Sequence, residues 1–395
     1  MLTKRTELQL SALTTALQTV YGITDPTKQF SLTEPMEIKL RKKILESDAF
    51  LRLITHRDVD QIQGQVVDVG LGKLFTGRAI ERFRKKVGMD GKQYSLVETD
   101  SCACIPWAVL AAWGNSGSDK EFIRLVTENA NKNFALDMLK IGFNGTSVVP
   151  VTNPDENPLG EDVNIGWHQY VKNTAPTQII TAPVYLDVEG NGTYKNLDSL
   201  VQDVINTHIH PVFQNDPRLV VLVGTDLVSY EQHRLLDAAT TPTEHKAAQS
   251  LSKTIAGRKA YTPPFFPSKR VVVTLLENLH LYTQKGSRRR KSENSEDRKQ
   301  HESSLWRYEG YAVPESEAYA AIDEAAMIIG PRPPALKSAD VERGVIDVDN
   351  MTPQASQAEP KAANAKAKPD VVSAEVTPLS TIDVALIAAQ NSQSE

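Results

Sequence analysis

The chain has 395 residues, of which 40% are hydrophobic and 24% are charged, and its net charge is −5. These proportions are typical of a globular protein of two or three packing units, and the slight negative charge argues against a general nucleic-acid binder. Its 2 cysteines exclude a disulfide framework, and the lack of a long apolar run predicts no membrane partner.

The N-terminal third is predicted to contain two helices and a long hairpin. The first helix lies within residues 1–22 and places Leu8, Leu10, Leu13, Leu17 and Val20 on one side. The second covers residues 35–53, and strands near 62–74 and 94–105 then bound a hairpin with a basic tip. Because a lone hairpin is only marginally stable, we expect this one to lie on another surface or to move.

The clearest single element is a long helix at residues 118–141, which follows a short helix at 106–113. Apolar residues recur there every four positions, beginning with Phe122, Val126 and Ala130. Ser118 and Glu121 have the spacing of a capping box, and Gly142 is expected to end the helix.

The remainder alternates between shorter helices and strands. We expect helices at 163–171, from Asn196 to a stop or kink at Pro211, at 226–238 and at 243–255, and strands at 179–186, 219–223, 270–276, 279–283 and 305–313. The basic run 287–291 is interpreted as a solvated loop, because acidic residues follow directly. Residues 331–395 contain no aromatic residue, and their composition predicts a disordered tail.

Few residue patterns indicate chemistry. Cys102 and Cys104 fall on the same face of a strand, but two ligands do not make a zinc site, and we favour small buried residues. His208 and His210 point to different sides of a helix, so they do not share a metal. The turn after Val223 could place an anion at a helix start, although a simple helix cap is favoured. We therefore predict no catalytic residue, no metal and no cofactor.

Several sequence stretches resemble one known family. They are Ile141–Gly145, Asn157–Leu159, Val163–Trp167, Thr174–Pro176, Asn196–Leu200, Asn215–Gly224 and Leu276–Leu279, the last followed by Arg288 and Arg289. As a set, and over residues 1–328, they resemble the major capsid protein of Peduovirus-type temperate tailed phages. The resemblance implies an α+β fold of the Hong Kong 97 type.

The family's parts can be placed on this sequence by position. The resemblance implies an N-terminal segment open to cleavage (1–30), an N-arm (31–60), an extended loop (61–105), a peripheral domain with the spine helix (106–169), an axial domain (170–267) and return strands of the peripheral domain (268–330). Residues 331–395 have no counterpart in it. Maturation cleavage would fall at Lys28, Gln29, Phe30 and Ser31, just after the first helix.

The implied function is structural rather than enzymatic. Copies would assemble in the host cytoplasm as pentamers and hexamers into an icosahedral virion shell around double-stranded DNA, without sequence specificity. The implied partners are an internal scaffold, a maturation protease and the portal protein. The basic residues Arg78, Arg82, Arg84, Lys85 and Lys86 at the loop tip would contact a neighbouring subunit. The alternatives are an α/β ligand-binding enzyme and another DNA-contacting phage structural protein.

Overall fold

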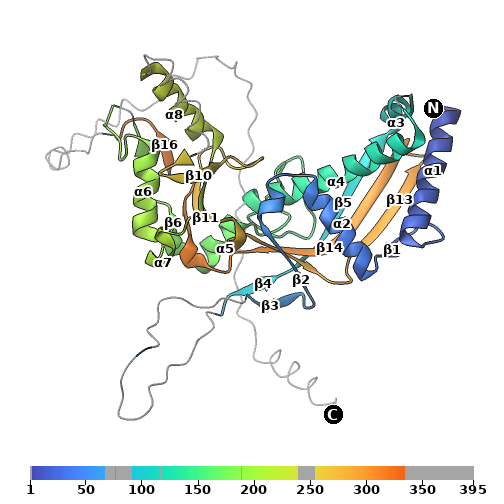
Figure 1. Cartoon of the computed structure of the whole chain (residues 1–395), viewed down its shortest axis with the longest axis horizontal. Helices are drawn as coiled ribbons and strands as arrows, with labels where there is room; N and C mark the ends of the chain where they lie inside the picture. The colour runs from blue at the N-terminus through green and yellow to red at the C-terminus, as the bar shows by residue number, and fades with distance from the viewer. Residues whose placement is uncertain are drawn as a thin grey trace, which may run out of the picture. The chain divides into compact units, whose positions relative to one another are not determined.

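The computed structural model describes residues 2–66, 76, 91–115, 117–187, 189–238 and 254–333 (Figure 1). Most of the basic loop tip, most of the expected helix at 243–255 and nearly all of the expected tail at 331–395 lie outside the described residues. The helices are α1 (Lys4–Tyr21), α2 (Glu34–Glu46), α3 (Trp107–Asn115), α4 (Asp119–Asn144), α5 (Trp167–Thr174), α6 (Leu197–His208), α7 (Pro211–Gln214) and α8 (Thr225–Ala238).

The first sheet is organised around one long strand. Its order is β1 (Phe30–Ser31), β13 (Arg289–Ser295), β14 (Gln300–Ala312), β12 (His280–Gln284) and β2 (Thr55–Val59), and β5 (Val97–Pro106) also pairs with β14. Strand β14 is antiparallel to β5 along one edge, and on its other edge it pairs first with β13 and then with β12. Since β14 joins these strands, segments far apart in the sequence meet on it.

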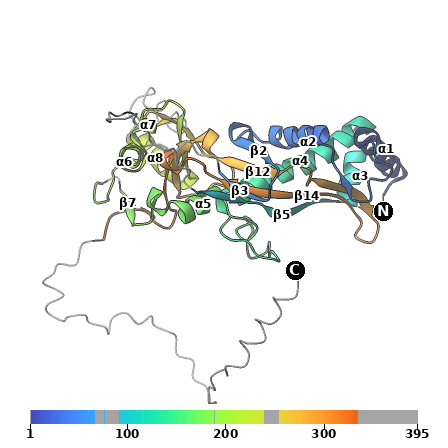
Figure 2. The same ribbon diagram turned by 90° about the horizontal axis from the view of Figure 1, so that it is seen from below.

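Helix α4 is the expected long helix, and it lies with α2 on one side of this sheet (Figure 2). Its buried residues include Phe134, Ala135 and Leu139, which belong to the largest apolar cluster. Ser118 caps it by accepting a hydrogen bond from the Glu121 amide at 3.4 Å, whereas the Glu121 carboxylate pairs with Arg124 instead of completing the capping box.

The expectation that Gly142 ends this helix is wrong, because the helix continues to Asn144. A Cβ at Gly142 would fall inside the van der Waals radius of the Trp167 ring. Trp167 is 2% exposed, and its indole donates to the His280 carbonyl at 2.9 Å. The glycine is therefore required for close packing between α4 and Trp167, not for a change in chain direction.

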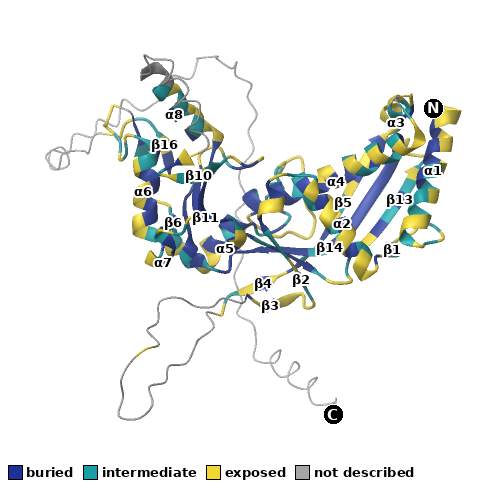
Figure 3. Cartoon of the chain, in the orientation of Figure 1, coloured by how far each residue is buried: buried dark blue, intermediate teal, exposed yellow. Residues whose placement is uncertain are grey.

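The second sheet has its own apolar cluster and is covered by α6. Its order is β6 (Ile179–Ile180), β15 (Tyr319–Ile322), β11 (Val271–Leu275), β8 (Leu219–Val223), β10 (Arg258–Tyr261) and β9 (Thr254–Ile255). Every residue of β8 and β11 is buried (Figure 3), as the unbroken apolar run of β8 predicts, and β11 buries Thr274 among its Val and Leu residues. Asn196 caps α6 by accepting the Ser199 amide at 2.8 Å, and Pro211 begins α7 rather than kinking α6.

The remaining strands form two short two-stranded ribbons. Strands β7 (Val184–Leu186) and β16 (Met327–Ile329) pair in parallel, and β3 (Gln63–Gln65) and β4 (Gln93–Ser95) pair antiparallel at the base of the expected hairpin. Residues 268–330 supply β12, β13 and β14 to the first sheet and β11 and β15 to the second. The two sheets are thus joined by one continuous stretch of chain.

One predicted apolar face and the extents of two predicted helices differ from those observed. In α1 only Leu10 and Leu13 of the expected stripe are buried, and they pack on Phe122 and Val126 of α4, whereas Leu8 and Val20 are exposed. The last residues of the expected helix at 243–255 form strand β9. Helix α5 begins at Trp167, after the expected start at residue 163, because the preceding residues form turns.

The interpretation of the run 287–291 as a solvated loop is also wrong, because β13 begins within it. Arg288 and Arg290 are each only 4% exposed. Arg288 pairs with Glu37 of α2 at 3.4 Å and with Asp58 of β2 at 3.1 Å. Glu37 also accepts the Gly286 and Arg288 amides. The basic run therefore supplies a buried ionic link between the N-terminal arm and the first sheet.

Among the described residues, no helix is both long enough and apolar enough to cross a membrane.

Candidate assembly surface

The base of the hairpin is a two-stranded ribbon of β3 and β4. Strands β3 and β4 contribute only a few residues each, and Tyr94 of β4 stacks on Tyr282 of β12 with centroids 4.7 Å apart and planes 9° apart. Gly64 of β3 lies under the Tyr94 ring, where a Cβ would come within 2.5 Å of the hydroxyl. The ribbon is thus held to the first sheet by an aromatic contact that needs a glycine opposite.

Polar contacts tie the same ribbon to the rest of the unit. The Lys92 ammonium donates to the Pro314 carbonyl at 2.8 Å, and the Tyr170 hydroxyl donates to the Gln93 carbonyl at 3.2 Å. Both bonds reach β4 and the residue before it from distant parts of the chain. These contacts fix the base of the loop, which is called the platform below and consists of Lys92, Gln93, Tyr94 and Tyr282. The segment between β3 and β4 therefore starts from a defined position.

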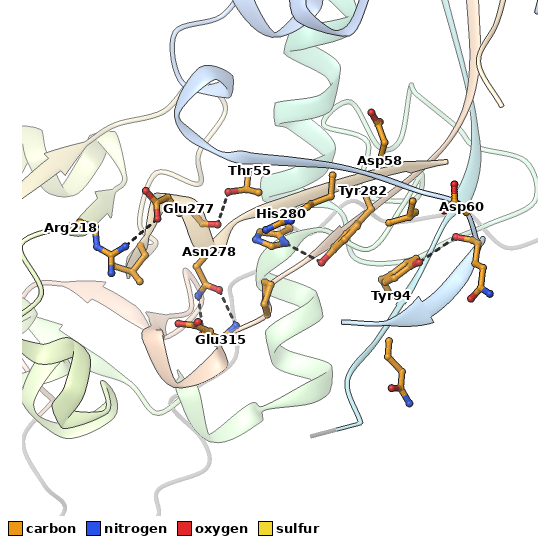
Figure 4. Close-up of a pocket in the computed structure, with 16 residues that line it drawn as sticks. Thr55, Asp58, Asp60, Tyr94, Arg218, Glu277, Asn278, His280, Tyr282 and Glu315 are labelled. Carbon is orange, nitrogen blue, oxygen red and sulfur yellow. Dashed lines mark hydrogen bonds and ion pairs between the residues drawn. The ribbon is translucent and has the colours of Figure 1, made fainter. Parts of the chain in front are cut away.

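A hollow of about 890 Å³ opens beside this platform (Figure 4). It is lined by Thr55, Arg57, Asp58, Val59, Asp60, Gln61, Gln65, Tyr94, Arg218, Leu275, Glu277, Asn278, His280, Tyr282, Pro314 and Glu315. Asn278 bridges to Glu315 through its amide group, which donates to the Glu315 carbonyl at 2.8 Å and accepts its amide at 2.9 Å. The edge strand β2 forms one wall, so the hollow lies along an unpaired side of the first sheet within the described residues.

Charges on the rim of this hollow are paired at its two ends. Arg218 contacts Asp216 at 2.8 Å and Glu277 at 3.3 Å, and Lys285 contacts Asp60 at 3.3 Å. The pairs of Arg218 with Glu277 and of Lys285 with Asp60 are largely exposed, so each is worth only about 0–1 kcal/mol, whereas the Asp216 side chain is only 14% exposed. Such a mixed, solvated rim suits contact with another protein surface better than capture of a small charged ligand.

The inner wall carries His280, the only histidine among the residues that line the hollow. Burial, with a smaller contribution from the Arg57 charge, lowers the pKa of His280 to about 4, so the ring is neutral near pH 7. Its Nδ1 lies 3.0 Å from the Tyr282 hydroxyl, whose own pKa is raised to about 12, mainly by burial. The contact between His280 and Tyr282 joins two residues of β12 and helps to hold the wall of the hollow together.

The turn after Val223, which the enzyme alternative required, does not form an anion site. A Cβ at Gly224 would overlap the Ser268 carbonyl, so this glycine is packed against the neighbouring loop. The Ser268 carbonyl also accepts the Asp226 amide at 3.2 Å at the start of α8. In the described ranges, moreover, no group of three or more His, Cys, Asp or Glu side chains is placed to hold a metal ion.

The predicted site residues fall in two places. Arg78, Arg82, Arg84, Lys85 and Lys86 lie outside the described residues, in the segment between β3 and β4. In the predicted cleavage region, Lys28, Gln29 and Ser31 are exposed and Phe30 is half-buried. Phe30 and Ser31 form β1, which pairs with Arg290 and Arg289 at the edge of the first sheet.

Sequence inspection missed the residues that organise the platform. Tyr94 and Tyr282 are 188 positions apart in the numbering of the chain, and no periodic pattern links them. The cysteines differ from expectation as well, because Cys102 and Cys104 are both exposed rather than buried. Gly64 and Tyr94 are likewise far apart in the sequence, so no local signal pointed to the contact.

Comparisons with known proteins agree on one family. The family described as "Phage major capsid protein, P2 family" matches residues 9–325. The capsid proteins of Escherichia phage P2 are 27% identical over 287 residues, which cover 67% of this chain and 78% of the relative. The major capsid protein of Serratia phage KSP20 is 28% identical over 278 residues, which cover 66% of this chain and 79% of that relative.

A solved structure supports the same conclusion for the fold. A chain from the satellite phage P4 procapsid that includes the size determination (Sid) protein has a TM-score of 0.67 and 23% identity to this one, covering 83% of this chain and 99% of that chain. The expected α+β fold of the Hong Kong 97 type is confirmed, and the alternative of an α/β enzyme is not favoured.

Proposed function

The chain belongs to the P2 family of phage major capsid proteins, and from this premise we propose that its copies associate as pentamers and hexamers into the icosahedral head that encloses double-stranded DNA. Its place is the capsid of the virion, and its role is structural rather than enzymatic. The family match over residues 9–325 is the observation that carries the proposal. Identical chains close such a shell through heterologous contacts around symmetry axes.

The two sheets supply the domains of this proposal. The first sheet with α4 would form most of the peripheral domain, and the second sheet with α6 would form most of the axial domain. Residues 268–330 would then belong to both, since they contribute strands to each sheet. Contacts around the five-fold and six-fold positions would come from the second sheet and the helices that cover it.

The extended loop is proposed as the contact with a neighbouring subunit. The platform of Tyr94 and Tyr282 fixes where the loop leaves the body, and the loop strands are too short to be stable alone. The basic residues Arg78, Arg82, Arg84, Lys85 and Lys86 would meet an acidic surface on that neighbour. Many weak contacts of this kind add up, because each copy is held at several sites at once.

Assembly of the full chain tests this proposal. Negative-stain microscopy and sedimentation should show pentamers, hexamers or shells for the wild type. The combined change Arg82→Glu, Arg84→Glu and Lys86→Glu should prevent shell formation at low salt, because it reverses the charge of the tip. The matched control Arg82→Lys, Arg84→Lys and Lys86→Arg keeps the charge and should assemble. If the Glu variant assembles like the wild type and with the same salt sensitivity, the loop is not part of the interface.

Cleavage at Lys28–Ser31 is the second part of the proposal. Lys28 and Gln29 are exposed and precede β1, so a maturation protease can reach them without unfolding the sheet, whereas a cut at Phe30–Ser31 would require β1 to separate from β13. Before cleavage, α1 packs on α3 and α4 and would present Leu8 and Val20 to an internal scaffold. Intact mass of chains from mature particles should give a species that begins near residue 31, and a species that begins at Met1 would refute cleavage.

The remaining partners are proposed from the family alone. They are the scaffold and protease of the phage, the portal protein at one vertex, and packaged DNA that is contacted without sequence specificity, with assembly in the host cytoplasm. A net charge of −5 suits a wall that does not adsorb its contents. Tight DNA binding by free subunits with a steep salt dependence would instead favour the alternative of a dedicated DNA-contacting component.

A further inference from the structure

Cys102 and Cys104 form a thiol pair on the surface of the first sheet. They lie on β5 with one residue between them, so both side chains leave the same face. Both are exposed, and their sulfur atoms are 3.7 Å apart. On the adjacent strand β14, Ser304 stands opposite Cys102 and donates its hydroxyl to the Cys102 sulfur at 3.2 Å, while Glu302 stands opposite Cys104.

The separation of the two sulfur atoms matches that of two thiolates bound to one ion. With a metal–sulfur bond of about 2.3 Å and a tetrahedral angle, two ligand sulfurs lie about 3.8 Å apart. The side chains therefore need almost no movement to bind one atom between them. Chelation is then favoured, because the second thiol is held at a high effective concentration once the first has bound.

A direct disulfide is less compatible with this strand. Alternate residues of an extended strand have Cα atoms about 6.8 Å apart, at the upper limit of the range that disulfides span. Strand β5 is held extended by its pairing with β14 from Val97 to Pro106. Forming the disulfide would require this paired strand to contract, whereas a bridging atom between the sulfurs does not.

We propose that Cys102 and Cys104 are a bidentate binding site for thiophilic ions, with trivalent arsenic and the soft divalent metal Cd²⁺ as the ligand class. Among the described residues no third His, Cys, Asp or Glu joins the pair in a metal-binding group, and Oε1 of the neighbouring Glu302 contacts Arg298 at 2.9 Å and Gln300 at 2.8 Å. The ion would thus keep open positions toward solvent. Burial and the contact with Cys102 raise the pKa of Cys104 to about 11, so binding has to displace its proton.

Phenylarsine oxide provides a probe with a defined reaction. In water it hydrates to phenylarsonous acid, which has two As–OH groups, and each thiol proton leaves with one hydroxyl as water while an As–S bond replaces an As–O bond. Arsenic stays trivalent, so no oxidant or reductant is consumed. Native mass spectrometry of the full chain should show one arsenical per chain. An excess of about 100-fold of a monothiol should leave it bound, whereas an equivalent amount of a dithiol should remove it.

Matched variants separate chelation from attachment to a single thiol. Cys102→Ser and Cys104→Ser each retain one thiol, and the monothiol should strip the arsenical from both at least about 100-fold more readily than from the wild type. Ser304→Ala keeps the pair and should behave as the wild type. Equal far-UV circular dichroism would show that each variant is folded. If the wild type loses the arsenical as readily as either single-cysteine variant, the pair is not a chelating site.

Discussion

The stacked pair at the base of the extended loop gives the most direct prediction. Tyr94 is 8% exposed and stacks on Tyr282 at 4.7 Å. Truncating a packed aromatic side chain to Ala costs about 3–5 kcal/mol, of which stacking contributes about 0.5–1.5 kcal/mol. We take the lower end for this small ribbon. Tyr94→Ala should therefore reduce the free energy that holds β3 and β4 closed by about 3 kcal/mol.

Gly64 tests whether the position of the ring is the cause. An Ala Cβ there would lie 2.5 Å from the Tyr94 hydroxyl, so Gly64→Ala must displace the ring, at about 1–3 kcal/mol. In a Tyr94→Ala background there is no ring to displace, and the two changes should cost less together than their sum by at least about 1 kcal/mol. Tyr94→Phe is the control, because the hydroxyl lies 3.5 Å from the Gln61 carbonyl and contributes little.

Amide hydrogen exchange on the unassembled full chain measures this local opening. About 3 kcal/mol corresponds to an acceleration of about 100-fold for protected amides of β3 and β4 in Tyr94→Ala, with Tyr94→Phe close to the wild type. Chemical denaturation reports the global stability in parallel. Strictly additive losses for Gly64→Ala and Tyr94→Ala, or equal exchange in the Ala and Phe variants, would show that the ring does not hold the ribbon.

Three further predictions concern the body of the protein. Gly142→Ala should lower the free energy of unfolding, measured by urea denaturation, by about 1–3 kcal/mol, because the added Cβ would overlap the Trp167 ring. Ala is the better helix former, so a gain in stability would contradict this packing. Burial lowers the pKa of His301 to about 4, below its unfolded value of 6.5, so the unfolded chain binds the proton first and stability should fall by up to about 3 kcal/mol as the pH drops from about 6.5 to 4. Denaturation at a series of pH values checks this, and His301→Gln should have a shallower slope. Arg288→Met leaves the buried Glu37 carboxylate without its ion pair and should lower the free energy of unfolding by about 3–5 kcal/mol in thermal or urea unfolding. Adding Glu37→Gln should recover part of this loss, and no recovery would mean that the unpaired charge is not the cause.

The elements that the sequence alone determined are those whose signals are local. Helix α4 was predictable because its apolar period and the Ser118 cap lie within one segment, and α6 with its Asn196 cap follows the same logic. Strand β8 was predictable from an unbroken apolar run between turns. The family resemblance rested on short motifs of the same kind, and it pointed correctly to the fold and to a capsid protein.

Only the tertiary structure decided how segments far apart in the sequence meet. Arg288 looks like part of a solvated basic loop until Glu37, 251 positions away, is placed beside it. Gly142 resembles a helix stop until Trp167 packs against it, and the Cys102–Cys104 pair was expected to be buried until β5 was placed with that face outward. In each case a contact between distant residues decides the structure, and the sequence pattern around either residue does not encode that contact.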